Sequence, residues 1–353
     1  MQRPNLFRPV LPAALAALLL VLPLVPPGGG RSVAGEAEAA LSNAAPPQTA
    51  LPDAALPEAA RARVVSIGGA TTEILYALGL EDRVAAVDVS STYPPAALAS
   101  RPNVGYIRAL SAEGVLSVGP TLILAQEGAG PPDVVAVLKG ASVPFETLPE
   151  ARTPEAVLAN IRRVATLMGV PERGEQVAGA VGRDFAALAA LRARITTPRR
   201  AAFILSASGA APVVGGAGSS ADAMFHLAGI VNAMSGLTGY KPAVDEALMA
   251  AAPDALILMA DRGHGLTDAA LAAMPGFAGT PAVRDGRLFR IDGGYALNFG
   301  PRTPQAARDL MALVYPELDL PALPAHGWTR PAGAAVTPPA DRPAPGAAAG
   351  TPG

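Results

Sequence analysis

The sequence predicts an α/β protein with two Rossmann-like lobes joined by one long helix. Three observations support this prediction. Short apolar segments alternate with helical patterns in both halves of the chain, a long amphipathic segment separates the halves, and a pattern of glutamate, proline and apolar strand occurs once in each half. Strand and helix units repeated on either side of one helix are typical of a protein with two similar lobes.

The composition narrows the classes of function. The chain has 353 residues, a formal net charge of −2, no cysteine and three histidines. This length suits about two domains, and the near-neutral charge argues against nucleic acid as a partner, because phosphate binding needs a basic face. The lack of cysteine excludes a disulfide scaffold, a thiol nucleophile and covalently attached c-type haem. His226, His264 and His326 are too far apart in sequence for a local zinc-binding pair.

The two ends of the chain differ from its middle. Residues 1–39 have arginines at positions 3 and 8, an apolar run at 10–25 and small residues after it, which is the pattern of a cleaved signal peptide. The apolar run is shorter than the roughly 20 residues of a membrane span, and no cysteine follows it for lipid attachment. We therefore expect a free periplasmic protein. Residues 40–60 and 321–353 are rich in alanine and proline and are predicted to be disordered.

The first lobe is predicted at 61–152. Residues 64–67 form a β-branched run that ends at two glycines, and a helical pattern then begins with threonine at its cap position. Further strands are expected at 84–88 and 121–125. Several of the strands predicted in the two lobes are continuous apolar runs, as expected of strands that are covered on both faces.

A helical region at 153–197 and a second lobe at 198–320 follow. The apolar residues of the segment 172–194 recur at helical spacing, and a helix of about 22 residues would be about 33 Å long, enough to connect two lobes. Strands are predicted at 201–205, 255–259 and 287–291.

A repeated pattern supports the assignment of two lobes. Glu113 and Glu246 each lie seven residues before a proline, and each proline is followed by an apolar strand. Each copy predicts a short helix, a stop at proline and a buried strand. Two similar lobes would leave a cleft between them, which is a favoured place for a ligand.

Three segments carry a family resemblance. RVVSIGGATTEILYALGLEDRVAAVDVSSTYPPAALASRPNVGYIRALSAEGVLSVGPTLILA resembles the first lobe of the haem-binding substrate-binding proteins of bacterial ABC transporters. GYKPAVDEALMAAAPDALILM and TPAVRDGRLFRIDGGYALNFGPRTPQAARDL are similar to the second lobe of the same family. The resemblance covers about 61–317 and implies the class III periplasmic binding protein fold, shared with proteins that bind siderophores and vitamin B12. The assignment to haem depends mainly on SSTYP at 90–94 and VGYIR at 104–108.

By this resemblance, Tyr93 is our first choice as the axial ligand of haem iron. Phenolate is a hard anionic donor that suits ferric haem, although a tyrosine with an ordinary pKa of about 10 needs the metal or a cation to stabilise the anion. Pro94 disfavours helical geometry at Tyr93, as in a loop at the rim of a lobe. The alternative is a loop tyrosine that packs its ring on the lobe.

Other residues could line the pocket. Tyr106 and Arg108 follow in the first lobe, where Arg108 could pair with a haem propionate or with the phenolate; the alternative is an exposed loop arginine. Arg262 and Tyr295 are comparable candidates in the second lobe. Some members of the family add a histidine ligand from the second lobe, but the matching region here, 205–209, has none. His264, in a glycine-flanked loop, is the substitute ligand.

The remaining polar candidates concern partners. The resemblance implies that one glutamate on each lobe pairs with arginines of the membrane permease, and Glu73 and Glu246 are carried over to this role. The alternative is that each stabilises the start of a helix. His226 is expected to be structural, and His326 and the only tryptophan, Trp328, lie in the segment expected to be disordered.

The sequence thus predicts a binding protein and not an enzyme. It would capture hemin and deliver it to an ABC permease and its ATPase, as a monomer that meets the membrane only through the permease. A ferric-siderophore or cobamide binder of the same class is the first alternative, and a haem-storage or signalling protein without a transporter is the second. No nucleotide-binding or nucleophile-elbow motif occurs; the glycine-rich segment 215–220 is either a flexible turn or a weak anion site.

Overall fold

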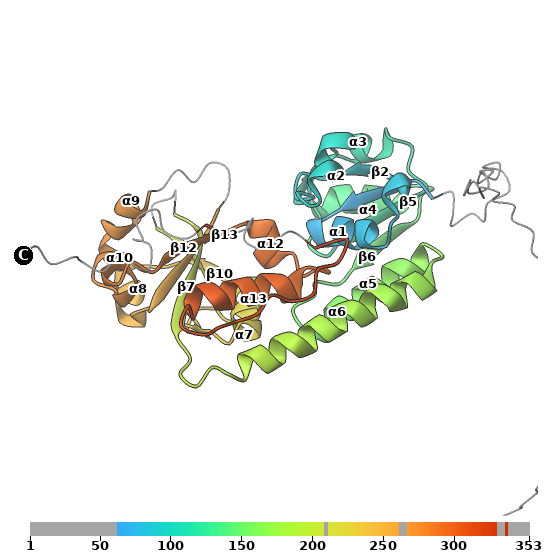
Figure 1. Cartoon of the computed structure of the whole chain (residues 1–353). Helices are drawn as coiled ribbons and strands as arrows, with labels where there is room; N and C mark the ends of the chain where they lie inside the picture. Colours follow the sequence, from blue (N-terminus) through green and yellow to red (C-terminus); the bar gives the residue numbers. More distant parts are fainter. Residues whose placement is uncertain (1–61, 208–210, 261–266, 330–335, 338–353) are drawn as a thin grey trace, which may run out of the picture. The chain divides into compact units, whose positions relative to one another are not determined.

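The computed structural model describes residues 62–207, 211–260, 267–329 and 336–337 (Figure 1). The expected signal peptide, Arg262 and His264 lie outside these residues. The first lobe contains a parallel sheet of four strands in the order β2-β1-β5-β6. Its strands are β1 Val64–Ile67, β2 Val84–Val87, β5 Leu122–Gln126 and β6 Phe145–Leu148. The three predicted strands are confirmed; β6 is additional, because its half-buried residues give no continuous apolar run.

Short helices and one small hairpin complete the first lobe. The helices are α1 Gly69–Ala77, α2 Pro95–Ser100, α3 Ala112–Leu116 and α4 Pro132–Gly140, with a 3-10 turn at Glu81–Arg83. The hairpin pairs β3 Gly105–Tyr106 with β4 Ala109–Leu110. In Figure 1 the helices flank the sheet, as expected for strands that are buried on both faces.

Two packed helices follow the first lobe. α5 spans Pro154–Leu167 and α6 spans Pro171–Arg192, so the predicted long helix is confirmed to within two residues at each end. Thr153 caps α5 by accepting a hydrogen bond from the amide of Ala156. Gly174 lets the helices approach closely, because a Cβ there would lie 2.3 Å from that of Ala165.

The second lobe has a mixed sheet in the order β10-β8-β7-β11-β12-β13, with β9 paired to β7. β7, β11 and β12 are parallel and correspond to the three predicted strands, whereas β8, β10 and β13 pair antiparallel. The strands are β7 Arg200–Ser206, β8 Val213–Gly215, β9 Val231–Asn232, β10 Tyr240–Pro242, β11 Ala255–Met259, β12 Leu288–Ile291 and β13 Val336–Thr337. The helices are α7 Ser220–Leu227, α8 Asp245–Ala251, α9 Asp268–Ala272, α10 Pro275–Ala278, α11 Pro281–Arg284, α12 Gly293–Leu297 and α13 Thr303–Val314.

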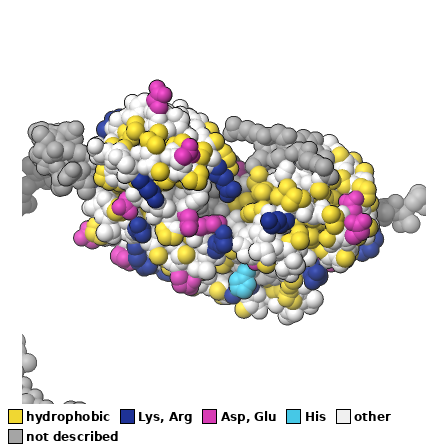
Figure 2. Space-filling model, turned by 180° about the vertical axis from the view of Figure 1, so that it is seen from behind, with side chains coloured by type: hydrophobic (Ala, Val, Ile, Leu, Met, Phe, Trp, Pro, Cys, Tyr) yellow, Lys and Arg dark blue, Asp and Glu magenta, His cyan; other side chains and the backbone are white. Residues whose placement is uncertain are grey.

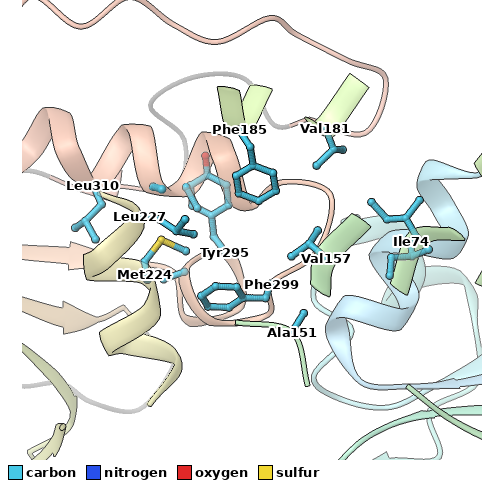
Figure 3. Packing of buried hydrophobic residues seen from close by; sticks show 14 of the residues in the cluster. Ile74, Ala151, Val157, Val181, Phe185, Met224, Leu227, Tyr295, Phe299 and Leu310 are labelled. Atoms are coloured by element: carbon cyan, nitrogen blue, oxygen red, sulfur yellow. The ribbon is translucent and has the colours of Figure 1, made fainter. Parts of the chain in front are cut away.

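The largest apolar cluster joins both lobes to the helices between them. It contains residues of α1, α5, α6, α7, α12 and α13. Figure 3 shows Phe185 of α6, Tyr295 of α12 and Phe299 among its members. Separate, smaller clusters lie in the second and the first lobe. The shared cluster explains how α6 connects the lobes through packing as well as through the chain.

The segment that follows α13 is partly ordered, against expectation. His326 stacks on Trp328 with ring centroids 4.7 Å apart, and its Nε2 lies 2.8 Å from Oδ2 of Asp184 on α6. Arg308 of α13 donates to the carbonyls of Pro321 and Leu320. The prediction of disorder from 321 onward is therefore wrong for 321–329. Composition alone does not reveal that two aromatic side chains and a few main-chain contacts can hold an alanine- and proline-rich segment.

Candidate functional site

A buried aspartate organises the carboxyl edge of the first sheet. Asp88, fully buried, follows β2, and its Oδ1 accepts from the amide of Gly68, 2.8 Å away, and from the hydroxyl of Ser91. Its Oδ2 accepts from the amide and hydroxyl of Ser90 and from the amide of Ile107. One carboxylate thus holds the loop after β1, the loop after β2 and the β3–β4 hairpin. Ligands in open α/β sheets bind at this edge.

Our sequence analysis missed the role of Asp88, although a signal was present. An acidic residue directly after a buried strand has few solvent contacts and needs nearby donors. The two serines that follow it, Ser90 and Ser91, are such donors. Ser91 extends the network through the Thr72 hydroxyl, 2.7 Å away, to Ser66.

Tyr93, on the loop after β2, is half-buried and lies under an arginine of the second lobe. The guanidinium carbon of Arg302 is 3.5 Å from the centre of the Tyr93 ring, within the range of a cation–π contact. Arg302 precedes α13 and is 2% exposed. The ring face of Tyr93 is therefore covered in this structure.

Glu73 of α1 is paired with the same arginine. Arg302 Nε and Nη2 donate to the two carboxylate oxygens of Glu73 at 2.9 and 2.6 Å, and both side chains are 3% exposed. Burial lowers the pKa of Arg302, but the Glu73 carboxylate raises it, and the net direction is upward. Asn298 donates to Glu73 as well, at 3.3 Å. Sequence reasoning assigned Glu73 to an exposed surface for docking; the structure instead places it in the interior.

Tyr295, expected to wall the cleft, lies in the core. It is 5% exposed, and its hydroxyl donates to Oδ2 of Asp309 at 2.9 Å. Burial raises the pKa of Tyr295 far above its ordinary value, and the nearby Asp309 raises it further. Its ring centre is 5.0 Å from the guanidinium of Arg302. Three residues predicted for separate roles, Glu73, Tyr93 and Tyr295, thus gather around one arginine.

Tyr106 and Arg108 lie on the β3–β4 hairpin with a different environment. Tyr106 is 47% exposed, and Arg108 is also exposed. Neither side chain makes a hydrogen bond or ion pair with another residue in the part of the chain that the structure describes. The hairpin itself is fixed, because the amide of Ile107 donates to Asp88 and Gly105 adopts a φ of +100°, which favours glycine. An available phenol and an available guanidinium therefore stand two residues apart on a fixed turn.

The two glutamates of the repeated pattern are both exposed. Glu113 lies in the first turn of α3 and Glu246 in the first turn of α8. Each helix is followed by a proline and a buried strand, β5 or β11, so the predicted repeat is confirmed. The charge on the face seen in Figure 2 is mixed, with acidic and basic side chains interspersed.

Other candidates do not form a site. His226 is exposed on α7, and the start of that helix is occupied by the Tyr240 hydroxyl, which contacts the hydroxyl of Ser220 and the amide of Ala221. Within the described residues, no three His, Asp or Glu side chains group as a metal site. A recess of about 210 Å³ next to α1 includes Gln126 and Phe299 in its lining. This space is open to solvent and encloses no volume that would hold even a water molecule, so it is not a ligand pocket.

The whole of the described first lobe and most of the second match one family model, which describes periplasmic binding proteins and covers residues 64–295. The chain belongs to the periplasmic binding protein family. Members of this family bind cargo outside the cytoplasm and catalyse no reaction, so the chain is an extracytoplasmic binding protein and not an enzyme. The class III fold inferred from the sequence is confirmed. In the part of the chain that the structure describes, none of the helices combines the length and apolarity needed to cross a bilayer.

Solved structures of haem-binding members are similar to the chain. The periplasmic heme-binding protein RhuT from Roseiflexus sp. RS-1, in apo form, is 39% identical with a TM-score of 0.69, covering 72% of this chain and 98% of RhuT. The periplasmic heme-binding protein BhuT, solved with two hemes, is 42% identical with a TM-score of 0.69, covering 72% and 97%.

Curated relatives are more distant. An uncharacterized ABC transporter substrate-binding lipoprotein, YvrC of Bacillus subtilis, is 25% identical over 72% of this chain and 80% of its own length. A vitamin B12-binding protein of Vibrio parahaemolyticus is 26% identical over 69% of this chain and 86% of its own length. Both ligand classes named by the relatives, haem and cobamide, are tetrapyrrole-type macrocycles with a central metal.

Proposed function

We propose that this periplasmic binding protein captures hemin and delivers it to an ABC importer for haem and iron uptake. The observation that carries the proposal is the exposed phenol of Tyr106, two residues from the exposed guanidinium of Arg108, at the carboxyl edge of the first sheet; neither group makes a hydrogen bond or ion pair with the described residues. Similarity to the haem-binding proteins RhuT and BhuT, at 39% and 42% identity, supports hemin as the cargo.

We assign the iron ligand to Tyr106 in preference to our first choice, Tyr93. Tyr93 takes part in the contact between the lobes through its ring face, which packs on Arg302, so hemin entering between the lobes would have to open that contact to reach it. Tyr106 needs no such opening, because almost half of its surface faces solvent. Tyr295 is a poorer ligand than either, because its buried hydroxyl, bonded to Asp309, stays protonated.

Arg108 serves the same cargo electrostatically. Hemin carries two propionates, and a guanidinium binds a carboxylate through two parallel hydrogen bonds. Arg108 lies on the same turn as Tyr106, two residues further along the chain, so it can serve a propionate of a porphyrin bound at Tyr106. Arg262 and His264 remain candidates from the second lobe.

Docking to the permease would use one exposed carboxylate from each lobe. Glu246 keeps the role inferred from the sequence. On the first lobe Glu113 replaces Glu73, because Glu113 is exposed at the equivalent position of the repeat, whereas Glu73 is buried against Arg302. Carboxylates on two rigid lobes fix the orientation of the complex and speed its formation.

We infer that the protein reaches the periplasm through a signal peptide at 1–39 and acts there as a monomer. A cobamide cargo is the second candidate, and it is favoured by the similarity to vitamin B12-binding proteins. Isothermal titration of the purified protein with hemin and with cyanocobalamin separates the two. Saturable binding of hemin alone supports the proposal. Binding of cyanocobalamin alone would show that the cargo is a cobamide and not hemin, and the class of protein would be unchanged.

A further inference from the structure

One ion pair links the two lobes in this structure. Glu73 belongs to α1 of the first lobe, and Arg302 precedes α13 of the second, 229 positions later. The partners that hold the Arg302 charge come chiefly from the opposite lobe, namely the carboxylate of Glu73 and the ring of Tyr93. The pair is a link between lobes and contributes little within either one.

The Glu73–Arg302 ion pair is buried and is joined by two hydrogen bonds, so we expect it to be either fully formed or fully broken. Both side chains are 3% exposed, and both oxygens of Glu73 are used. Removing one partner from a buried pair leaves an uncompensated charge, which is strongly destabilising, so partial opening is disfavoured. The lobes should therefore either stay in contact with the pair intact or separate far enough for water to solvate both charges.

Glycines around the pair bring the lobes close together. A Cβ at Gly69 would lie 2.1 Å from the side-chain nitrogen Nδ2 of Asn298, and a Cβ at Gly294 would lie 2.8 Å from the hydroxyl oxygen of Thr92. Gly300 lies against the Glu73 carboxylate, with 3.1 Å from an ideal Cβ to Oε2. The surfaces that meet around the ion pair have small or polar side chains.

We propose that Glu73 and Arg302 form a latch that holds the two lobes in one arrangement in the cargo-free protein, and that the lobes separate when this latch is released. The latch fixes the spacing of the lobes and hence the width available to a large planar cargo. This inference does not depend on the identity of the cargo.

Pulsed electron resonance between two spin labels tests the latch directly. The chain has no cysteine, so labels can be attached at Val137→Cys on α4 and Met249→Cys on α8, which are 58% and 48% exposed. We expect one narrow distance distribution in the otherwise wild-type protein. With Arg302→Gln we expect a second population at longer distance, well above the roughly 10% of an ordinary minor state.

Matched variants make the test decisive. Arg162→Gln removes an arginine from an exposed pair with Glu175 between α5 and α6, and it should leave the distribution unchanged. Arg302→Lys keeps the positive charge but cannot make the two parallel hydrogen bonds to Glu73. It is the variant to measure if circular dichroism shows that Arg302→Gln is not folded. An unchanged distribution in a folded Arg302 variant would overturn the latch. No hemin is used, so that failure would leave the proposed cargo untouched.

Discussion

Replacing Asp88 by asparagine should destabilise the first lobe. The carboxylate accepts five hydrogen bonds, three of them from backbone amides, which cannot rotate to find another acceptor. An asparagine must turn its NH₂ group towards one side. The less costly choice faces Gly68 and Ser91, because the Ser91 hydroxyl can reverse while only the Gly68 amide loses its partner.

The magnitude follows from these bonds. One stranded, buried donor costs about 1–3 kcal/mol. The remaining bonds lose the charge that strengthened them, which adds about 1–2 kcal/mol. We therefore expect Asp88→Asn to lower the free energy of unfolding by about 3 kcal/mol. At about 2–4 °C per kcal/mol, the midpoint of thermal unfolding falls by about 10 °C.

Calorimetry of the purified protein at pH 7 measures this shift, and Ser90→Ala is the matched control. That substitution removes one side-chain bond to Asp88 and leaves every backbone amide satisfied, so it should cost only about 1 kcal/mol. Hydrogen exchange should also rise in the β3–β4 hairpin of Asp88→Asn, because the Ile107 amide depends on the carboxylate. A midpoint within about 1 °C of wild type would refute the assignment of Asp88 as the organising residue.

Three further predictions follow from the surface, the ordered segment after α13 and the close packing around Gly69. Glu113→Arg combined with Glu246→Arg should abolish growth on hemin as sole iron source, because the charge reversal removes the two carboxylates proposed to dock on the permease. Hemin binding in vitro should be unchanged, because both side chains are exposed. Normal growth would reject their role in docking. His326→Ala should lower the free energy of unfolding by about 1 kcal/mol through loss of its bond to Asp184, and an unaltered denaturation midpoint would contradict this. Gly69→Ala should lower the midpoint of thermal unfolding, because its methyl carbon would lie 2.8 Å from the backbone oxygen of Ser90, which cannot move aside as the side-chain amide of Asn298 can; an unchanged midpoint would contradict this.

Much of the fold could be predicted from the sequence because its signals are local. The strand at 255–259 is a continuous apolar run, the strand at 64–67 is interrupted only by Ser66, and α6 has regular helical spacing. β6 and the antiparallel β8 were missed, since half-buried or three-residue strands have no distinctive period. The contacts of 321–329 were missed because they depend on tertiary packing.

The site could be predicted only in part. Resemblance drew attention to Tyr93 and Tyr106, but sequence alone does not reveal that Arg302 stacks on the first and leaves the second exposed. The same limit explains Glu73, whose partner is 229 positions away. A glutamate at a helix start has the same local pattern whether its carboxylate faces solvent or a buried arginine.

Absorption spectroscopy during a hemin titration tests the central claim most directly, with wild type, Tyr106→Phe and Tyr93→Phe compared side by side. We predict a saturable Soret band with a phenolate charge-transfer feature in wild type and in Tyr93→Phe, and loss of that feature in Tyr106→Phe. Loss of the feature in Tyr93→Phe alone would return the iron ligand to Tyr93. No saturable binding by the wild-type protein would contradict hemin as the cargo.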